Sequence, residues 1–289
     1  KMINYIKRKD LEVDKYNTCI ENALQNRIYA FSWYLDIVAD NWDVLVLDDY
    51  KAVMPIPWRK KYFIKYISQP YYCQQLGVFS QKSISKEIQE NFMIKIPAKF
   101  VKVSLNFNSD NFFVSDMESK KNYILSLKNS YEILFKSFSK GRKHAIKVGV
   151  RNDLFVAKTT LLPLVNIKKK FYNYEGFSEE KLQLINKEVL ENDKGFVLGV
   201  FNKEELLGGG LFLVSNNRIV YLFSAFNDEG RKQQAASFLI KSIIEKNEKS
   251  DFILDFEGGN LSNTAKFFKS FGSEIEEYHQ ISYSKYLLF

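Results

Sequence analysis

Residues 195–214, GFVLGVFNKEELLGGGLFLV, contain the pattern from which we predict the fold. They indicate a strand over 196–201, a turn, and a second strand over 206–214. A stretch with helical spacing, 178–192, precedes this strand pair. Strand, helix, strand, short helix and strand follow in that order, over 218–226, 231–247, 252–258, 263–272 and 274–289.

The first half of the chain repeats this order more loosely. Residues 42–58, WDVLVLDDYKAVMPIPW, also read as strand, turn and strand. We therefore predict an α/β (α+β) fold made of two similar domains, 1–135 and 136–289. Each would hold a mixed, mostly antiparallel sheet flanked by helices, and the second would carry the active cleft. One large α+β domain is the alternative.

Composition excludes several classes of protein. The chain has 289 residues, 46% of them hydrophobic, and its 25 Phe and 17 Tyr argue against intrinsic disorder. Two cysteines, Cys19 and Cys73, cannot form a disulfide framework. No run approaches the ~18 apolar residues of a membrane span. The first fifteen residues lack the apolar core of a signal peptide, so we expect a cytoplasmic protein.

Common catalytic motifs are missing from the sequence. Two histidines, His144 and His279, are too few for a metal site, so we expect no metal. The sequence contains no nucleophile elbow, phosphate-binding loop or dinucleotide-binding fingerprint. The net charge is +8, but only seven of the 42 basic residues are Arg. A local patch for an anionic substrate is therefore favoured over nucleic acid as the main ligand.

The segment 254–278, LDFEGGNLSNTAKFFKSFGSEIEEY, holds the candidate catalytic residues. Asp255 and Glu257 alternate with apolar residues and precede a Gly-Gly turn, so one strand face would carry both carboxylates. We expect Glu257 to take a proton from an amine, with Asp255 as a supporting hydrogen-bond acceptor for the turn. The alternative is a structural turn with solvated acids.

Two glycine-rich or small-residue stretches are further candidates. Three consecutive glycines, 208–210, indicate a bulge, made either for packing or for close approach of a ligand. The turn 226–237, FNDEGRKQQAAS, opens a helix whose free N–H groups could bind an anion, although it could equally be a solvated helix start. The candidate anion-binding residues there are Arg231, Lys232, Gln233, Gln234, Ala235 and Ala236.

Taken together, the order of elements resembles the GNAT acyltransferase fold in its doubled form, as in the Fem-type peptidyl or aminoacyl transferases. The resemblance covers nearly the whole chain. It depends on WDVLVLDDYKAVMPIP at 42–57, QPYYCQQLGVFS at 69–80, KGRKHAIKVGV at 140–150 and DFEGG with FFKSFG within 255–272.

The resemblance implies an N-acyltransferase in which an amine attacks the donor directly, without a covalent enzyme intermediate. The co-substrate would be acyl-CoA or aminoacyl-tRNA, so tRNA would be a transient partner. The acceptor would carry an amine, with a cell-wall precursor as one candidate. GNAT enzymes hold the coenzyme A pyrophosphate in a Q/R-x-x-G-x-G/A turn. Arg231 and Ala236 match that pattern, but Gln234 replaces its central Gly, so we expect weak coenzyme A binding.

Substrate contacts are expected from two further stretches. In the Fem pattern a basic helix such as 140–150 lies near the cleft between domains, where Arg142 and Lys143 could hold a diphosphate or carboxylate. It could also be a solvated helix face. Polar and aromatic residues of the first domain could line the same cleft: Gln69, Tyr71, Tyr72, Gln74 and Gln75. A non-catalytic binding module on a decayed GNAT scaffold is the alternative function, and the oligomeric state stays open.

Overall fold

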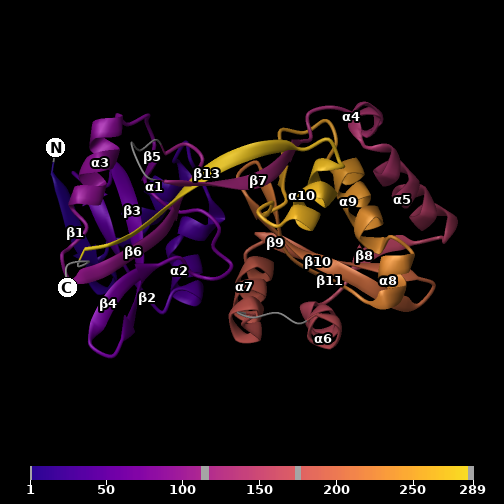
Figure 1. The fold of residues 1–289 in the computed structure, drawn as a ribbon, viewed down its shortest axis with the longest axis horizontal. Helices are drawn as coiled ribbons and strands as arrows, with labels where there is room; N and C mark the ends of the chain where they lie inside the picture. The colour runs from indigo at the N-terminus through magenta and orange to yellow at the C-terminus, as the bar shows by residue number, and fades with distance from the viewer. Residues whose placement is uncertain (1, 112–116, 173–176, 286–289) are drawn as a thin grey trace. The chain divides into compact units, whose positions relative to one another are not determined.

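The computed structural model describes residues 2–111, 117–172 and 177–285 (Figure 1). The chain divides into two compact units, residues 1–120 with 277–289, and residues 121–276. The boundary expected at 135/136 therefore lies inside the second unit. The last strand was expected to reach 289, and residues 286–289 lie outside the described part of the chain.

The first unit contains a mixed sheet with the strand order β1-β2-β3-β4-β6-β13, and β5 pairs with β3. β4 and β6 are parallel, and the other pairs are antiparallel. The strands are β1 Ile3–Lys7, β2 Asn41–Leu47, β3 Ala52–Lys61, β4 Ile64–Ser68, β5 Phe79–Ser80, β6 Phe100–Phe107 and β13 Glu274–Ser284. The helices are η1 Arg8–Asp10, α1 Val13–Glu21, η2 Ile28–Ala30, α2 Ser32–Val38 and α3 Lys86–Ile94.

The second unit has the strand order β7-β12-β11-β10-β9-β8. β11 and β12 are parallel, and the other pairs are antiparallel. The strands are β7 Glu118–Ser126, β8 Phe155–Lys158, β9 Gly195–Asn202, β10 Glu205–Ser215, β11 Arg218–Phe226 and β12 Ile253–Asp255. The helices are α4 Tyr131–Ser137, α5 Lys140–Arg151, α6 Leu161–Phe171, α7 Glu179–Glu191, α8 Asp228–Lys232, α9 Ala235–Lys246 and α10 Ser262–Lys269.

The two sheets repeat one plan, which confirms the predicted fold class. In each, four strands pair antiparallel in chain order, and the strand after the next helix, β6 or β12, pairs in parallel with the fourth. The short strand β5 is an addition in the first sheet. The sixth strand comes from the opposite half of the sequence. β7 follows β6 in the chain but pairs with β12, whereas β13 follows β12 but pairs with β6. This exchange of strands explains why the unit boundaries fall inside β7 and β13.

The three glycines of β10 are explained by close packing. Gly208 lies at φ +148°, where the register with β9 shifts. A Cβ atom at Gly209 would lie 2.0 Å from the carbonyl oxygen of Leu198 on β9. Larger residues would force β9 and β10 apart, so the predicted bulge is present and packing accounts for its composition.

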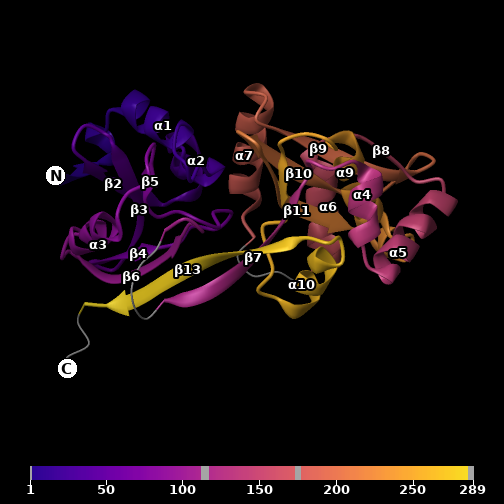
Figure 2. The ribbon, with the colours of Figure 1, turned by 90° about the horizontal axis from the view of Figure 1, so that it is seen from above.

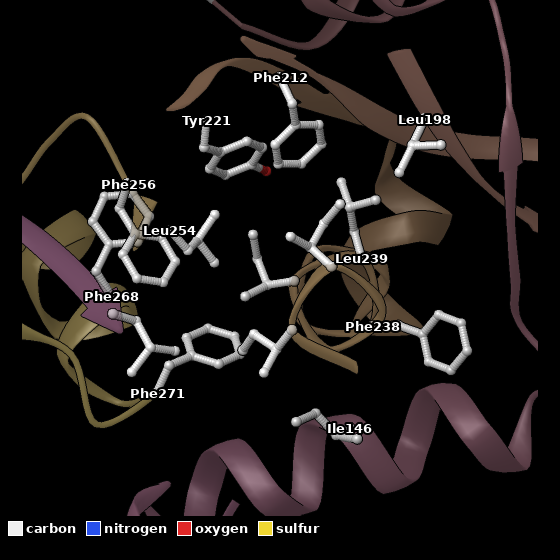
Figure 3. Close-up of a cluster of buried hydrophobic side chains, with 14 of the residues drawn as sticks. Ile146, Leu198, Phe212, Tyr221, Phe238, Leu239, Leu254, Phe256, Phe268 and Phe271 are labelled. Carbon is white, nitrogen blue, oxygen red and sulfur yellow. The ribbon is translucent and has the colours of Figure 1, made fainter. Parts of the chain in front are cut away.

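Helices cover both faces of the second sheet, with α9 and α10 on one side and α6 and α7 on the other (Figures 1 and 2). The core on the α9 side brings together side chains from the sheet and from helices α4, α5, α9 and α10, and Figure 3 shows part of it. Phe212 and Tyr221 stack with ring centroids 5.0 Å apart, and Phe256 stacks on Phe268 at 4.6 Å. Each such ring removes ~150–250 Å² from water, so these aromatic residues supply much of the packing that holds the helices on the sheet.

Candidate functional site

The parallel strands β11 and β12 separate soon after they begin to pair. Their register runs only from Arg218 opposite Ile253 to Val220 opposite Asp255. β11 then continues to Phe226, whereas β12 ends at Asp255. Among the residues that the structure describes, β11 therefore has no partner strand on this side from Tyr221 onward. Open edges at the carboxyl ends of parallel strands are where α/β sheets bind ligands.

Two features shape this open edge. The register between β10 and β11 places Phe212 opposite Tyr221 and Leu211 opposite Phe223, so Leu222 is an extra residue in a bulge. A bulge turns a backbone group away from the ladder and is common beside active sites. Farther along β11, the hydroxyl of Tyr172 accepts from the Phe226 N–H and donates to the Phe226 carbonyl, both at 3.2 Å. Tyr172 thereby ties the end of β11 to the segment after α6.

The turn that follows β11 leads into α9 through a left-handed residue. Gln234 is the N-cap residue of α9, with φ 62° and ψ 33°, and its side chain does not cap the helix. The first backbone hydrogen bond of α9 runs from the Phe238 N–H to the Gln234 carbonyl. Helix geometry leaves the three preceding N–H groups, of Ala235, Ala236 and Ser237, without an intrahelical acceptor. The position that holds Gly in the GNAT pattern thus has a backbone conformation that favours Gly.

Most of the polar side chains predicted at this turn are held by neighbouring residues. Arg231 pairs with Asp228 at 3.0 Å, and its guanidinium lies 4.7 Å from the ring centroid of Tyr172. Lys232 lies 3.7 Å from Glu229. Gln233 donates to Glu229 and accepts from Asn202, at 2.8 and 2.7 Å. Gln234 donates to the carbonyl of Arg231 at 3.3 Å. The backbone N–H groups of α9 are thus the main anion-binding groups that this turn offers.

The two predicted carboxylates occupy different environments. Asp255 is the last residue of β12 and is 1% exposed. Its Oδ1 accepts from the Glu257 N–H at 2.8 Å, which is the supporting contact that the sequence predicts. Glu257 lies beyond the strand with φ 50°, so the expected alternation along one strand face stops at Asp255. Glu257 is partly exposed.

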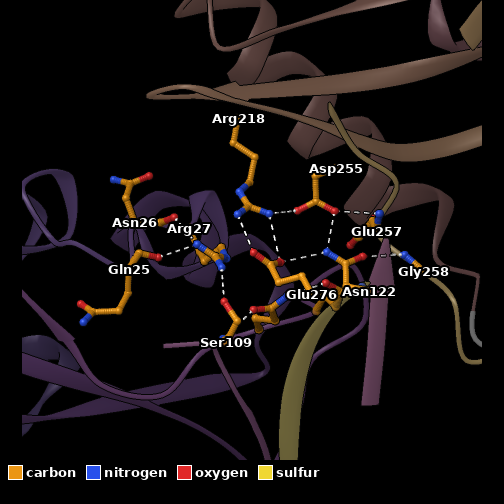
Figure 4. A network of polar contacts seen from close by, with 12 residues as sticks. Gln25, Asn26, Arg27, Ser109, Asn122, Arg218, Asp255, Glu257, Gly258 and Glu276 are labelled. Carbon is orange, nitrogen blue, oxygen red and sulfur yellow. Dashed lines mark hydrogen bonds and ion pairs between the residues drawn. The ribbon is translucent and has the colours of Figure 1, made fainter. Parts of the chain in front are cut away.

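Asp255 belongs to a buried polar network that the sequence did not predict (Figure 4). Arg218 forms ion pairs with Asp255 at 2.6 Å and with Glu276 at 2.8 Å. Asn122 of β7 donates to Asp255 at 2.9 Å and to Glu276 at 3.1 Å. The carbonyl oxygen of the Asn122 side chain accepts from the Gly258 N–H at 3.1 Å. The network therefore fixes the turn that carries Glu257.

The charges of this network are coupled. Burial lowers the pKa of Arg218, but the carboxylates of Asp255 and Glu276 outweigh burial and hold that pKa above its usual range. One cation faces two carboxylates in a region where Arg218 and Asp255 are 8% and 1% exposed. No sequence motif links Asn122, Arg218 and Glu276, since they come from three different strands.

Arg142 belongs to α5, and its side chain extends toward α9 and the end of α10 within the second unit. Its Nε donates to Ser270 at 2.9 Å, and its Nη1 donates to Ser237 of α9. The guanidinium lies 4.1 and 4.6 Å from the ring centroids of Phe267 and Phe271. Burial lowers the pKa of Arg142 to about 10, which leaves it cationic at neutral pH.

Lys143, the neighbour of Arg142, contacts α4 instead. Its Nζ donates to the carbonyl of Lys136 at 2.9 Å and lies 5.5 Å from the ring centroid of Phe135. The two basic residues predicted to bind substrate together therefore contact different elements.

The polar and aromatic stretch predicted in the first unit mainly holds its own loop. Gln69 donates to the Cys73 carbonyl at 2.7 Å and accepts from the Asn106 N–H at 3.0 Å. Gln75 is fully buried and donates to the Gln74 side chain at 2.8 Å. Tyr72 has φ 59°, and its carbonyl accepts from the Tyr34 hydroxyl. Tyr71 is 50% exposed, so it is the member of this group most available to a ligand.

The two thiols of the chain are poorly placed for nucleophilic attack. Cys19 and Cys73 are both buried, and burial raises the pKa of Cys19 to about 11. A buried thiol that stays protonated is a poor nucleophile. Within the described segments there is no group of three or more side chains that could hold a metal ion. Nor is any helix of these segments long and apolar enough to cross a membrane.

Comparisons with known proteins agree with the fold. No family model matches the sequence, and no curated protein matches it in sequence. The structure is similar to FemX, with a TM-score of 0.69 at 10% identity, over 96% of each chain. A protein of unknown function from Bacteroides thetaiotaomicron gives a TM-score of 0.57 at 10% identity, over 96% of this chain and 99% of that one.

A tandem GNAT protein from the clavulanic acid biosynthesis pathway gives a TM-score of 0.51 at 9% identity, over 97% of this chain and 98% of that one. Likeness at this level of identity concerns the fold. It confirms the expected architecture: the chain has a tandem GNAT-like fold, in common with FemX.

Proposed function

We propose that this protein is an N-acyltransferase that transfers an acyl or aminoacyl group to an amine at the open edge of β11. The observation that carries the proposal is the separation of β11 and β12 directly after Val220 and Asp255. The bulge at Leu222 and the uncapped start of α9 adjoin the same edge. Together they supply an open strand edge, a backbone donor and a helix N-terminus that can bind an anion.

The reaction needs few protein groups. The amine nitrogen attacks the donor carbonyl carbon, so a C–N bond forms and a tetrahedral oxyanion develops. The backbone N–H at the Leu222 bulge is the proposed oxyanion donor. The bond to the sulfur or ester oxygen of the donor then breaks, and the leaving group departs with the electron pair. Glu257 takes the proton that the amine loses, and the burial of both thiols supports direct transfer.

The donor is proposed from the turn at α9. Acyl-CoA and aminoacyl-tRNA both carry phosphates and an activated carbonyl. Gln234 stands where the GNAT pattern has Gly, and in this proposal its side chain leaves less room for a pyrophosphate at the N–H groups of α9, which favours a donor that does not depend on that contact. We therefore rank aminoacyl-tRNA first. The proposed acceptor is an amine of a cell-wall precursor, consistent with the likeness to FemX, and the proposed compartment is the cytoplasm.

A transfer assay tests this function. The purified chain is incubated with aminoacyl-tRNA or with acetyl-CoA, together with amines that include a nucleotide-linked cell-wall peptide. Mass spectrometry then detects the N-acylated product. Product that requires both the chain and the acceptor supports the proposal. Hydrolysis of the donor without N-acylated product, for every donor, contradicts it.

A non-catalytic binding module remains the second candidate, because one observation favours it. Asp255 already accepts from Arg218, Asn122 and the Glu257 N–H, so it has no role left in proton transfer. Ligands that raise the melting temperature without ever being converted would distinguish this candidate from the enzyme.

A further inference from the structure

The first unit contains a cavity of about 490 Å³ that is separate from the open edge of β11. It lies where β1 ends and β2 begins, next to the end of α2, and Trp58 of β3 and Lys65 of β4 also line it. Five cationic side chains line it: Lys7, Arg8, Lys9, Lys65 and Lys99. The volume falls within the range of small-molecule sites.

A buried carboxylate organises one wall of this cavity. Asp43 is 6% exposed and accepts three hydrogen bonds from uncharged donors. The donors are the Tyr5 hydroxyl, the Arg8 backbone N–H at 3.0 Å and the Trp58 indole N–H at 2.9 Å. Asp43 thereby fixes the orientation of the Tyr5 and Trp58 rings.

Each of these two rings contacts the ammonium group of a lysine. The Nζ of Lys99 lies 4.3 Å from the ring centroid of Tyr5, and the Nζ of Lys65 lies 4.6 Å from that of Trp58. Phe100 contacts both rings, with centroid distances of 6.4 and 6.1 Å. The rings restrict the two lysines without neutralising them, because a cation–π contact leaves the ammonium charge in place.

The cations of the cavity outnumber the carboxylates that can pair with them. Three carboxylates line it, and Asp36 is paired with Arg8 at 2.8 Å, whereas Asp40 is paired with Arg59 at 3.2 Å. The lysines form no ion pair within 4.0 Å in the described part of the chain; they are Lys7, Lys9, Lys65 and Lys99.

The lysines also affect one another. Burial lowers the pKa of Lys99, Asp43 acts in the opposite direction, and the charges of Lys65 and Lys7 lower it further. An anion in the cavity would relieve this repulsion. Phosphate fits best, because it has a double negative charge and several acceptor oxygens for the ammonium groups that line this cavity from different segments of the chain.

We propose that this cavity is a binding site for a phosphate or diphosphate group, with Lys65 and Lys99 as its main ligands. The site is distinct from the proposed transferase site and does not depend on it. A phosphorylated metabolite and a phospholipid headgroup both offer this chemistry.

Calorimetry with the full chain tests the site. The probes are inorganic pyrophosphate and inorganic phosphate, with sodium chloride at matched ionic strength as the reference. We expect saturable binding of pyrophosphate with one site per chain. The double variant Lys65→Met, Lys99→Met should weaken binding at least about tenfold, since two charge-assisted contacts are lost.

Lys60→Met is the matched control, because Lys60 also lies near an aromatic ring, at 5.7 Å from Phe63, but does not line the cavity. It should change the affinity less than about twofold. Unaltered circular dichroism of both variants verifies folding. Equal loss of affinity in the control and the double variant, or binding no stronger than in matched chloride, would overturn the proposal.

A second experiment distinguishes a phospholipid headgroup from a soluble phosphorylated compound as the ligand. Phe63 is 92% exposed at the tip of the β3–β4 hairpin, which also carries Lys65. Sedimentation with vesicles of phosphatidylglycerol and phosphatidylcholine is compared for the wild type, Phe63→Ser and the double lysine variant. If both variants lose the vesicle binding that the wild type shows, the site binds a lipid headgroup. Pyrophosphate binding without vesicle binding assigns it to a soluble phosphate compound, and the absence of both contradicts the site.

Discussion

Arg218 begins β11 and Asp255 ends β12, and an ion pair of 2.6 Å joins their side chains beside the point where the two strands separate. Glu276 and Asn122 complete the network around them. The ion pair thus fixes the turn that carries Glu257. Substitutions of Asp255 and Glu257 can separate its structural role from the role of Glu257 in the reaction.

Asp255→Asn should destabilise the protein. The substitution leaves Arg218 with one carboxylate in place of two and removes an anionic acceptor that is 1% exposed. Breaking a buried pair in this way costs roughly 3 kcal/mol. Urea denaturation followed by circular dichroism measures the loss. A change below about 0.5 kcal/mol, typical of a surface site, would show that the network contributes little to stability.

Glu257→Gln should abolish transfer and leave stability nearly unchanged. Glu257 is partly exposed, so its charge contributes little to folding, whereas proton transfer typically contributes about 10²–10⁴-fold to a rate. The measurement is the initial rate of N-acylated product, once a donor and acceptor are established. Glu274→Gln, at an exposed position of β13, is the control. Full activity of the Glu257 variant would remove this residue from the mechanism.

Gln234→Gly should strengthen coenzyme A binding. Gln234 has φ 62°, which a Gly adopts without steric cost, and a Gly there would expose the N–H groups at the start of α9. We expect little or no acetyl-CoA binding by the wild type and about tenfold tighter binding by the variant. Calorimetry checks both. Tight binding by the wild type that Arg231→Glu removes would show that Gln234 does not obstruct the site.

Arg142→Lys should destabilise the second unit despite the conserved charge. Lys cannot bond Ser270 and Ser237 at once, and it has no planar guanidinium to pack against Phe267 and Phe271. The loss should be about 1–2 kcal/mol, from one or two hydrogen bonds, measured by thermal unfolding. Lys147→Arg on the exposed face of α5 is the matched control. Equal melting temperatures for both variants would contradict a structural role for the Arg142 guanidinium.

Stability should fall as the pH rises from about 9 to about 11, in part through Cys19. Burial raises the pKa of this thiol from 9.0 to about 11, so the unfolded chain releases its proton first and is stabilised relative to the folded one. The stabilisation is fully present below pH 9. The loss assigned to Cys19 should be on the order of 1–3 kcal/mol. Cys19→Ala should make the unfolding free energy depend less on pH over this interval. An unchanged slope of unfolding free energy against pH would show that the Cys19 thiol does not contribute to the loss.

The sequence by itself determined the repeat and the order of elements. Apolar runs bounded by turn residues predicted β9, β10 and β11, and helical patterns predicted α7 and α9, since these patterns depend on neighbours close in the chain. The supporting contact from Asp255 to the turn also followed from local spacing. Helix α6 was not predicted, because Pro163 interrupts the helical pattern.

Only the tertiary structure decided the contacts between distant segments. The exchange of β7 and β13 between the halves has no local signature, so the unit boundaries at 120/121 and 276/277 differ from the expected one. The same holds for Arg218 with Glu276, and for Asp43 beneath Tyr5 and Trp58. Strand pairing over more than a hundred residues and burial of charged groups depend on which strands meet. The free energy of that packing is a property of the assembled sheet, which no local stretch of sequence specifies.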